Sequence, residues 1–216
     1  AGQVGEYVVR TVLNKERSDV MPVTYTNRKG VTFTLTQTVT KHGKTRYNFA
    51  REPVQGQPVE AVPEGREIRE SVNGIVTLGK ATPQLILPEE LAAVAAQLRQ
   101  LPDARRYRTE AKSDHILIYE NAGGDLTALV SELIGQGFLS APGQLERVRE
   151  IEHRHARYEP VMQFILVDEE KRRFAAERMS YRGVNHWIDI GRNGTIHELA
   201  AKYIPTLGTD EFFELW

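Results

Sequence analysis

Hydrophobic and polar residues alternate through the first third of the chain, which is the pattern of β-strands. The clearest case is VTFTLTQTVT, residues 31–40, which carries a threonine at every second position. Turn-forming residues flank this run, and a second alternating segment follows at 45–51. Further β-rich segments lie at 6–13, 23–26 and 67–78. Within 67–78, Asn73-Gly74 favours the positive φ angles of a type I′ turn, so consecutive antiparallel hairpins are predicted.

The pattern changes after Thr82-Pro83, where apolar residues begin to recur at helical spacing. Residues 87–101 carry such a stripe, and Pro88 suits the first turn of a helix. Further helices are predicted at 125–135, 143–157 and 196–203. Strands are predicted as a hairpin over 106–120 and as a meander over 161–167, 173–181 and 186–190.

These elements predict an α+β fold with two parts. The first is an N-terminal antiparallel β-hairpin module, residues 1–82. The second is a mixed domain, residues 83–216, with helices packed on an antiparallel meander. Residues 161–167 are apolar on both faces, so we expect them to form a central, covered strand. The chain of 216 residues is long enough to bury a sizeable core.

The alternation predicts a threonine face on the strand 31–40. Thr34, Thr36 and Thr38 fall on the side opposite Phe33 and Leu35, so we expect one buried apolar face and one hydrated hydroxyl face. On the returning strand, the same alternation places Tyr47 and Phe49 on the apolar side, with Arg46 and Asn48 beside the threonines.

Positive charge is concentrated in one early segment of the chain. Residues 21–51 contain six cations and no Asp or Glu, in a chain whose net charge is −1. These cations are Arg28, Lys29, Lys41, Lys44, Arg46 and Arg51. Hydroxyls and cations are the groups that hold phosphate oxygens. The first hypothesis is therefore a non-enzymatic nucleic-acid or polyanion-binding protein, in which both turns and the ribbon between them project their cations together. The alternative is a hydrated strand face whose edge lysines prevent edge-to-edge pairing.

Two other function classes stay open. A protein-interaction or assembly module would use a strand edge or the apolar C-terminal tail, in which Phe212, Phe213 and Trp216 contact a partner or a second copy. A metal-dependent hydrolase would use carboxylate and imidazole groups of the rear part, and the candidates are His186, Asp189 and His197. Their spacing matches no known metal motif, so no metal site or cofactor is predicted.

Several residues that suggest chemistry have simpler explanations. His153 and His155 are two positions apart on a predicted helix, so they point in different directions and do not share a metal. The run Asp168 to Lys171 is predicted to be a charged turn. The chain lacks the GxxxxGK[ST], GxGxxG, HExxH and GxSxG motifs.

The amino-acid composition bears on the cellular location and on membrane association. The absence of cysteine excludes disulfides and thiolate chemistry, and it fits a cytoplasmic location. No stretch approaches the roughly 20 apolar residues of a membrane-spanning helix, so no membrane partner is expected.

Five strings carry a resemblance to a known family. They are YTNRKG (25–30), KHGKTRYNFARE (41–52), VPEGREIRESVNGIVTL (62–78), FILVDEEKRRFAAERMSYRG (164–183) and FFELW (212–216). In these strings the chain resembles a family of uncharacterised bacterial proteins that pair an N-terminal YTNRKG module with a C-terminal DEEKR block. The resemblance covers residues 23–80 and 160–216. It implies no reaction and no functional residues, and the alternating threonines depart from the more aromatic pattern of the family.

Overall fold

The computed structural model describes residues 21–51, 56–123, 126–136, 143–180 and 185–209. Within these ranges the protein combines antiparallel sheets with short helices, so the predicted α+β class is confirmed. The predicted strand at 6–13 and the aromatic tail at 212–216 lie outside the described residues. None of the helices in the described ranges is both long and apolar enough to cross a membrane.

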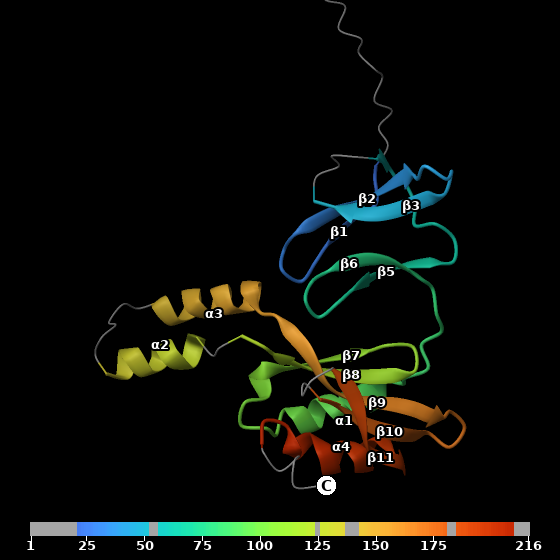
Figure 1. The fold of residues 1–216 in the computed structure, drawn as a ribbon. Helices are drawn as coiled ribbons and strands as arrows, with labels where there is room; N and C mark the ends of the chain where they lie inside the picture. Colours follow the sequence, from blue (N-terminus) through green and yellow to red (C-terminus); the bar gives the residue numbers. More distant parts are fainter. Residues whose placement is uncertain (1–20, 52–55, 124–125, 137–142, 181–184, 210–216) are drawn as a thin grey trace, which may run out of the picture.

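Two small antiparallel sheets form the first part of the chain (Figure 1). The first sheet comprises β1 (Thr24–Thr26), β2 (Thr32–Val39), β3 (Thr45–Ala50) and β4 (Gln57–Pro58). β2 lies at its centre, with β3 along one edge and with β1 and β4 at different points of the other. The second sheet is the hairpin of β5 (Arg66–Glu70) and β6 (Val76–Lys80).

The turn between β5 and β6 differs from the predicted type I′ turn. Ser71 donates its backbone N–H to Ile75 across 3.0 Å, so three residues connect the closing pair. Of these three, Gly74 alone has a positive φ, at 76°, whereas a type I′ turn needs two such residues. Asn73 does not enter the left-handed region. Its side chain instead accepts from the backbone N–H of Tyr158 at 2.7 Å and donates to the carbonyl of Tyr158 at 3.0 Å.

A five-stranded antiparallel sheet forms the rear part, in the order β11-β10-β9-β8-β7. Its strands are β7 (Tyr107–Ala111), β8 (His115–Asn121), β9 (Tyr158–Asp168), β10 (Arg173–Ser180) and β11 (His186–Gly194). β9 is the central strand, and its Met162 and Phe164 are fully buried. The predicted central position of 161–167 is therefore confirmed. The predicted cover is incomplete, because Met162 and Phe164 lie on one face of the strand and Val167 is 56 % exposed.

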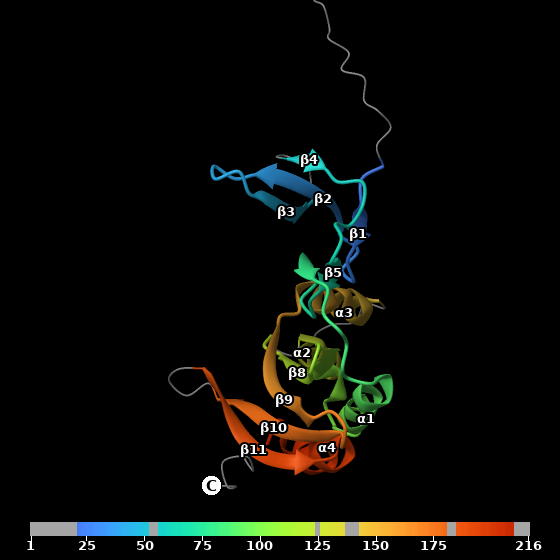
Figure 2. The same cartoon turned by 90° about the vertical axis from the view of Figure 1, so that its right-hand side faces the viewer.

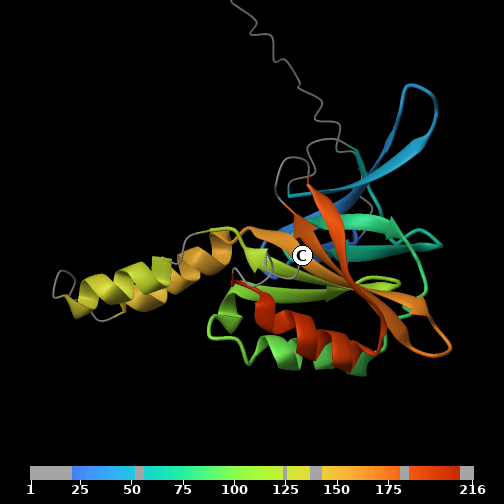
Figure 3. The same ribbon diagram turned by 60° about the horizontal axis from the view of Figure 1, so that its bottom comes forward.

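Two helices lie side by side across one face of this sheet (Figure 3). They are α1 (Pro88–Leu98) and α4 (Ile196–Tyr203), and the short helices η1 (Ala104–Arg106) and η2 (Ile204–Thr206) border them. Thr195 caps α4, because its hydroxyl accepts from the Glu198 backbone while the Glu198 carboxylate accepts from the Thr195 backbone. Apolar residues of both helices and of the strands form the main core.

The other two helices do not pack on the meander, which corrects the prediction for them. α2 (Leu126–Gly135) and α3 (Gln144–His155) connect β8 to β9, lie against each other and project away from the body (Figures 1 and 3). For α3 the composition agrees with this position, because the helix is rich in Glu and Arg and has few apolar residues to bury on a sheet.

The β5–β6 hairpin contacts the rear sheet near the start of β9 (Figure 2). Val72, 3 % exposed, packs with Leu117, Tyr119 and Tyr158 in a second, smaller core cluster. This cluster lies apart from the main core and packs the β5–β6 loop against the rear part.

Candidate nucleic-acid interface

The predicted cations fall into two groups, because consecutive turns of an antiparallel meander lie at opposite ends of the strand they share. The turn at 27–30 precedes β2 and the turn at 40–44 follows it. A strand of eight residues separates them by roughly 25 Å. The expectation that both turns project their cations together is therefore wrong.

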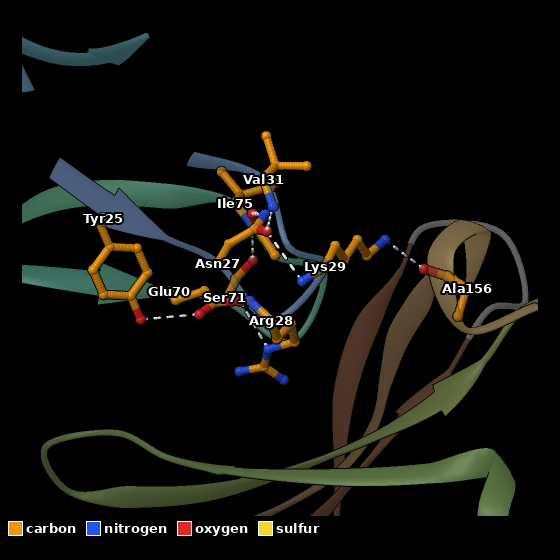
Figure 4. Close-up of polar contacts among 10 residues, drawn as sticks. Tyr25, Asn27, Arg28, Lys29, Val31, Glu70, Ser71, Ile75 and Ala156 are labelled. Atoms are coloured by element: carbon orange, nitrogen blue, oxygen red, sulfur yellow. Dashed lines mark hydrogen bonds and ion pairs between the residues drawn. The ribbon is translucent and has the colours of Figure 1, made fainter. Parts of the chain in front are cut away.

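The first turn is fastened to the β5–β6 loop by Asn27, which is only 6 % exposed (Figure 4). Its Oδ1 accepts from the backbone N–H groups of Lys29, at 3.0 Å, and Val31, at 2.9 Å. Its Nδ2 donates to the carbonyl of Gly74 at 2.7 Å. Asn27 thus closes its own turn and binds a second one 47 residues away in the chain.

Arg28 lies against a carboxylate. Its backbone N–H and its Nε both donate to Glu70 Oε1 at 2.9 Å, and the Tyr25 hydroxyl donates to Glu70 Oε2 at 2.9 Å (Figure 4). Burial by itself would raise the pKa of Glu70, but these hydrogen bonds outweigh burial and lower it. The hydrogen bond from the Tyr25 hydroxyl to Glu70 is the main cause of the raised pKa of Tyr25. The charge of Arg28 is therefore balanced within the protein.

Lys29 points to the rear part. Its Nζ donates to the carbonyl of Ala156 at 3.2 Å, directly after the C-terminus of α3, where the helix dipole favours a cation (Figure 4). The first turn therefore joins the two parts of the molecule, and its two predicted phosphate contacts are engaged within the protein.

The second turn has a geometry that leaves its side chains outside. Thr40 and Lys44 close it, since the Thr40 N–H donates to the Lys44 carbonyl at 2.9 Å. The Gly43 N–H donates back to the Thr40 carbonyl at 2.9 Å, and Gly43 has a φ of 75°. This is the three-residue hairpin loop with glycine in the left-handed position.

The β2–β3 ribbon carries this turn away from the body (Figures 2 and 3). Lys41, Lys44 and Arg46 are all exposed, and so is His42. Across the residues that the structure describes, no carboxylate pairs with any of the three cations. These three charges remain available to an external anion.

Arg51 belongs to neither turn. It follows β3 at the end remote from the second turn, and its guanidinium lies over the ring of Phe33, 5.9 Å from the centroid. This cation–π contact places it away from Lys41 and Lys44.

The predicted threonine register is confirmed, but the predicted hydration is not. Thr36 pairs with Asn48 and Thr38 with Arg46, while Thr34 pairs with Ala50. However, Thr36 is only 1 % exposed and its hydroxyl donates to the Asn48 carbonyl at 3.2 Å. The prediction of a hydrated face is wrong at Thr36.

The chain around Gly56 explains this burial. A Cβ on Gly56 would lie 3.3 Å from the Thr36 Cβ and 2.8 Å from the Gln37 carbonyl, so this segment packs closely on β2. Thr38 is half-buried and closer to the second turn, and it shares a face with Arg46. Of the three predicted threonines, Thr38 is therefore the one placed beside an available cation.

A hollow of about 380 Å³ lies beside the ribbon. It is lined by Gln37, Thr38, Val39, Thr45, Gly56 and Gln57. Val39 is 72 % exposed, although the alternation predicts it on the buried apolar face. The prediction is therefore wrong at Val39, which is the last residue of β2 and lies beside the projecting second turn. The sequence did not predict that Val39 and Gln57 line one hollow, because the pairing of β4 with β2 joins distant segments of the chain.

A cleft of about 700 Å³ lies between the β5–β6 and β7–β8 hairpins. Its lining includes four carboxylates, Glu67, Glu70, Glu110 and Asp114, and two cations, Arg69 and Lys112. Carboxylates outnumber cations, so this cleft does not suit a polyanion.

The rear metal candidates are not brought together. Asp189 accepts from the backbone N–H of Gly191 at 3.1 Å and from Arg192 Nε, while His197 is exposed on α4. In the part of the chain that is described, no group of three or more His, Cys, Asp or Glu side chains is placed to hold a metal ion.

The charged turn predicted at Asp168 is confirmed, since its Oδ1 accepts from the Lys171 backbone N–H at 2.9 Å.

Comparison with known proteins assigns no function to this arrangement. No protein-family model matches the chain, and neither a curated protein nor a solved structure shows significant similarity to it.

Proposed function

We propose that this protein binds nucleic acid through the tip of the β2–β3 ribbon, within an N-terminal β-hairpin module of residues 1–82. The observation that carries the proposal is the exposure of Lys41, Lys44 and Arg46 without a carboxylate partner among the described residues. The proposal is narrower than the hypothesis from the sequence. Arg28 and Lys29 are bound within the protein, and Arg51 stacks on Phe33.

Charge supports a phosphate ligand. A phosphate-binding cation has to be free of internal carboxylates, because neutralising it within the protein removes its attraction for an external anion. The half-buried hydroxyl of Thr38 lies on the face of Arg46 and adds a weaker hydrogen-bonding group. Three phosphate contacts correspond to a slope of about −2.7 in a plot of log affinity against log salt concentration on duplex DNA.

The test is fluorescence anisotropy of a labelled oligonucleotide with the whole chain, at 50 and 200 mM salt. Wild-type affinity is expected to fall about 40-fold across this range, from the slope above. Lys41→Gln/Lys44→Gln is expected to leave one contact and a fall of about threefold to fourfold.

A matched control keeps the same charge change elsewhere. Lys171→Gln/Lys202→Gln removes two exposed lysines of the rear part, from the β9–β10 turn and α4. It is expected to bind as the wild type does. Equal losses in the two double variants would mean that net charge acts instead of the ribbon. Undetectable wild-type binding at 50 mM salt would end the proposal.

An assembly role is the second candidate, and the projecting α2–α3 hairpin favours it. Ile151 on α3 is 52 % exposed, and among the described elements no third layer packs on this helix pair (Figure 3). Light scattering of the wild type and of Ile151→Ser tests this candidate. A monomeric wild type would remove self-assembly from consideration.

A further inference from the structure

The exposed Val39 at the ribbon tip has no role in phosphate binding. Val39 is 72 % exposed next to Lys41 and Lys44, so its methyl groups are open to contact by a ligand that the lysines hold. The alternation of the strand puts Val39 and Gln37 on one face and Thr38 on the other. One side of the ribbon is therefore uncharged, and Arg46 lies on the opposite side.

The uncharged side has the groups that contact base edges. Gln37 lies directly opposite Gln57 of β4, and Val39 lies opposite Thr45 of β3. Amide groups of glutamine bind adenine edges in the major groove, while apolar and threonine methyl groups contact the thymine methyl. These residues also line the hollow beside the ribbon.

The dimensions of the free ribbon suit the major groove of B-DNA. Within the described chain, β4 pairs no further than Gln37, so residues 38–46 form a two-stranded ribbon. The three residues from Thr38 to Thr40, which closes the loop, extend about 10 Å at about 3.3 Å each. The major groove is about 12 Å wide and about 8.5 Å deep, and it admits a two-stranded β-ribbon. The major groove of A-form RNA is too narrow for it.

We infer that the ribbon tip enters the major groove of duplex DNA, with Val39 against a thymine methyl and Lys41, Lys44 and Arg46 on the flanking phosphates. This inference rests on the proposed nucleic-acid binding and adds the class of ligand and the face that contacts the bases. It predicts a preference for B-form duplex over duplex RNA of the same sequence, and a dependence on the thymine methyl.

The experiment compares three labelled 16-base-pair duplexes with an A·T-rich centre: DNA with thymine, DNA with uracil in place of thymine, and RNA. Uracil removes the methyl groups and keeps the phosphates and base pairing. Wild type is expected to lose about fourfold in affinity per contacted methyl on uracil DNA, and to bind the RNA more weakly still. Val39→Ser is expected to bind thymine and uracil DNA equally.

Val167→Ser is the matched control, because Val167 is 56 % exposed on β9 of the rear sheet. It is expected to keep the wild-type response to thymine, and unchanged thermal unfolding of both variants would show that they fold. Wild-type binding that ignores both the methyl group and the duplex form would overturn the inference. If Lys41→Gln/Lys44→Gln still weakened binding in that case, the proposed function would stand. Absence of binding to all three duplexes would remove both.

Discussion

Glu90 holds the first turn of α1 against the turn between β9 and β10. Its substitution tests how much this contact stabilises the rear part of the protein. Glu90 is 5 % exposed, and its Oε1 accepts from Arg172 Nε at 2.8 Å. Its Oε2 accepts from Arg172 Nη2 and from the Leu87 backbone N–H at 2.8 Å. Arg172 also donates to the Leu85 carbonyl at 3.1 Å. A single carboxylate therefore satisfies a guanidinium and the N-terminus of a helix.

Glu90→Gln keeps the shape of the side chain but removes the charge and replaces one acceptor oxygen with a donor. Breaking a buried ion pair by removing one partner costs about 3–5 kcal/mol. The Arg172 side chain is 29 % exposed, so water recovers part of this loss. We expect the free energy of unfolding to fall by about 2–3 kcal/mol, which combines that value with partial rehydration.

The assay is urea unfolding at pH 7, followed by far-UV circular dichroism and by tryptophan fluorescence, to which Trp187 on β11 contributes. With a slope of about 2–3 kcal/mol per molar urea, the midpoint is expected to fall by about 1 M. Glu89→Gln is the matched control, because Glu89 lies in the same helical turn but is exposed. It is expected to cost at most about 1 kcal/mol through the helix dipole.

A double-mutant cycle with Arg172→Met isolates the pair, and we expect a coupling energy of about 2 kcal/mol between residues in direct contact. If Glu90→Gln were no more destabilising than Glu89→Gln, or if the coupling were near zero, the assignment of Glu90 as a structural anchor would be refuted.

Two further predictions concern the front sheets. The lowered pKa of Glu70 means that its contribution to stability is present above its unfolded value of 4.5 and is lost as the pH falls through the folded value. Glu70→Gln is therefore expected to cost about 1–2 kcal/mol at pH 7 and less as the pH falls below 4.5 in thermal melts, and a constant difference down to pH 2 would contradict this. Asn27→Ala leaves the Gly74 carbonyl and two N–H groups without their partner, so it is expected to cost about 2–3 kcal/mol and to lower the melting temperature by roughly 4–12 °C. Asn48→Ala, on the exposed side of β3, serves as its control, and equal melting temperatures for the two variants would contradict the role of Asn27.

Local patterns in the sequence predicted most elements, because alternation and helical spacing depend on neighbours in the chain. The strand at 31–40, its pairing with 45–51 and the cap of α4 at Thr195 follow from residues a few positions apart. The second turn follows from nearby residues in the same way, because Gly43 takes the left-handed position of a three-residue loop closed by Thr40 and Lys44.

Distant segments decided the rest. The sequence by itself placed six cations in one early stretch, but the tertiary structure decided which of them stay available. Arg28 meets Glu70, 42 residues away, and Lys29 meets Ala156, 127 residues away, while no carboxylate in the described ranges pairs with Lys41. The burial of Thr36 reverses the local pattern because the segment around Gly56 packs on it, and Val39 reverses the pattern by being exposed at the end of β2 beside the second turn. Periodicity records which side chains share a face, whereas burial depends on what packs against that face, and only the assembled fold determines that.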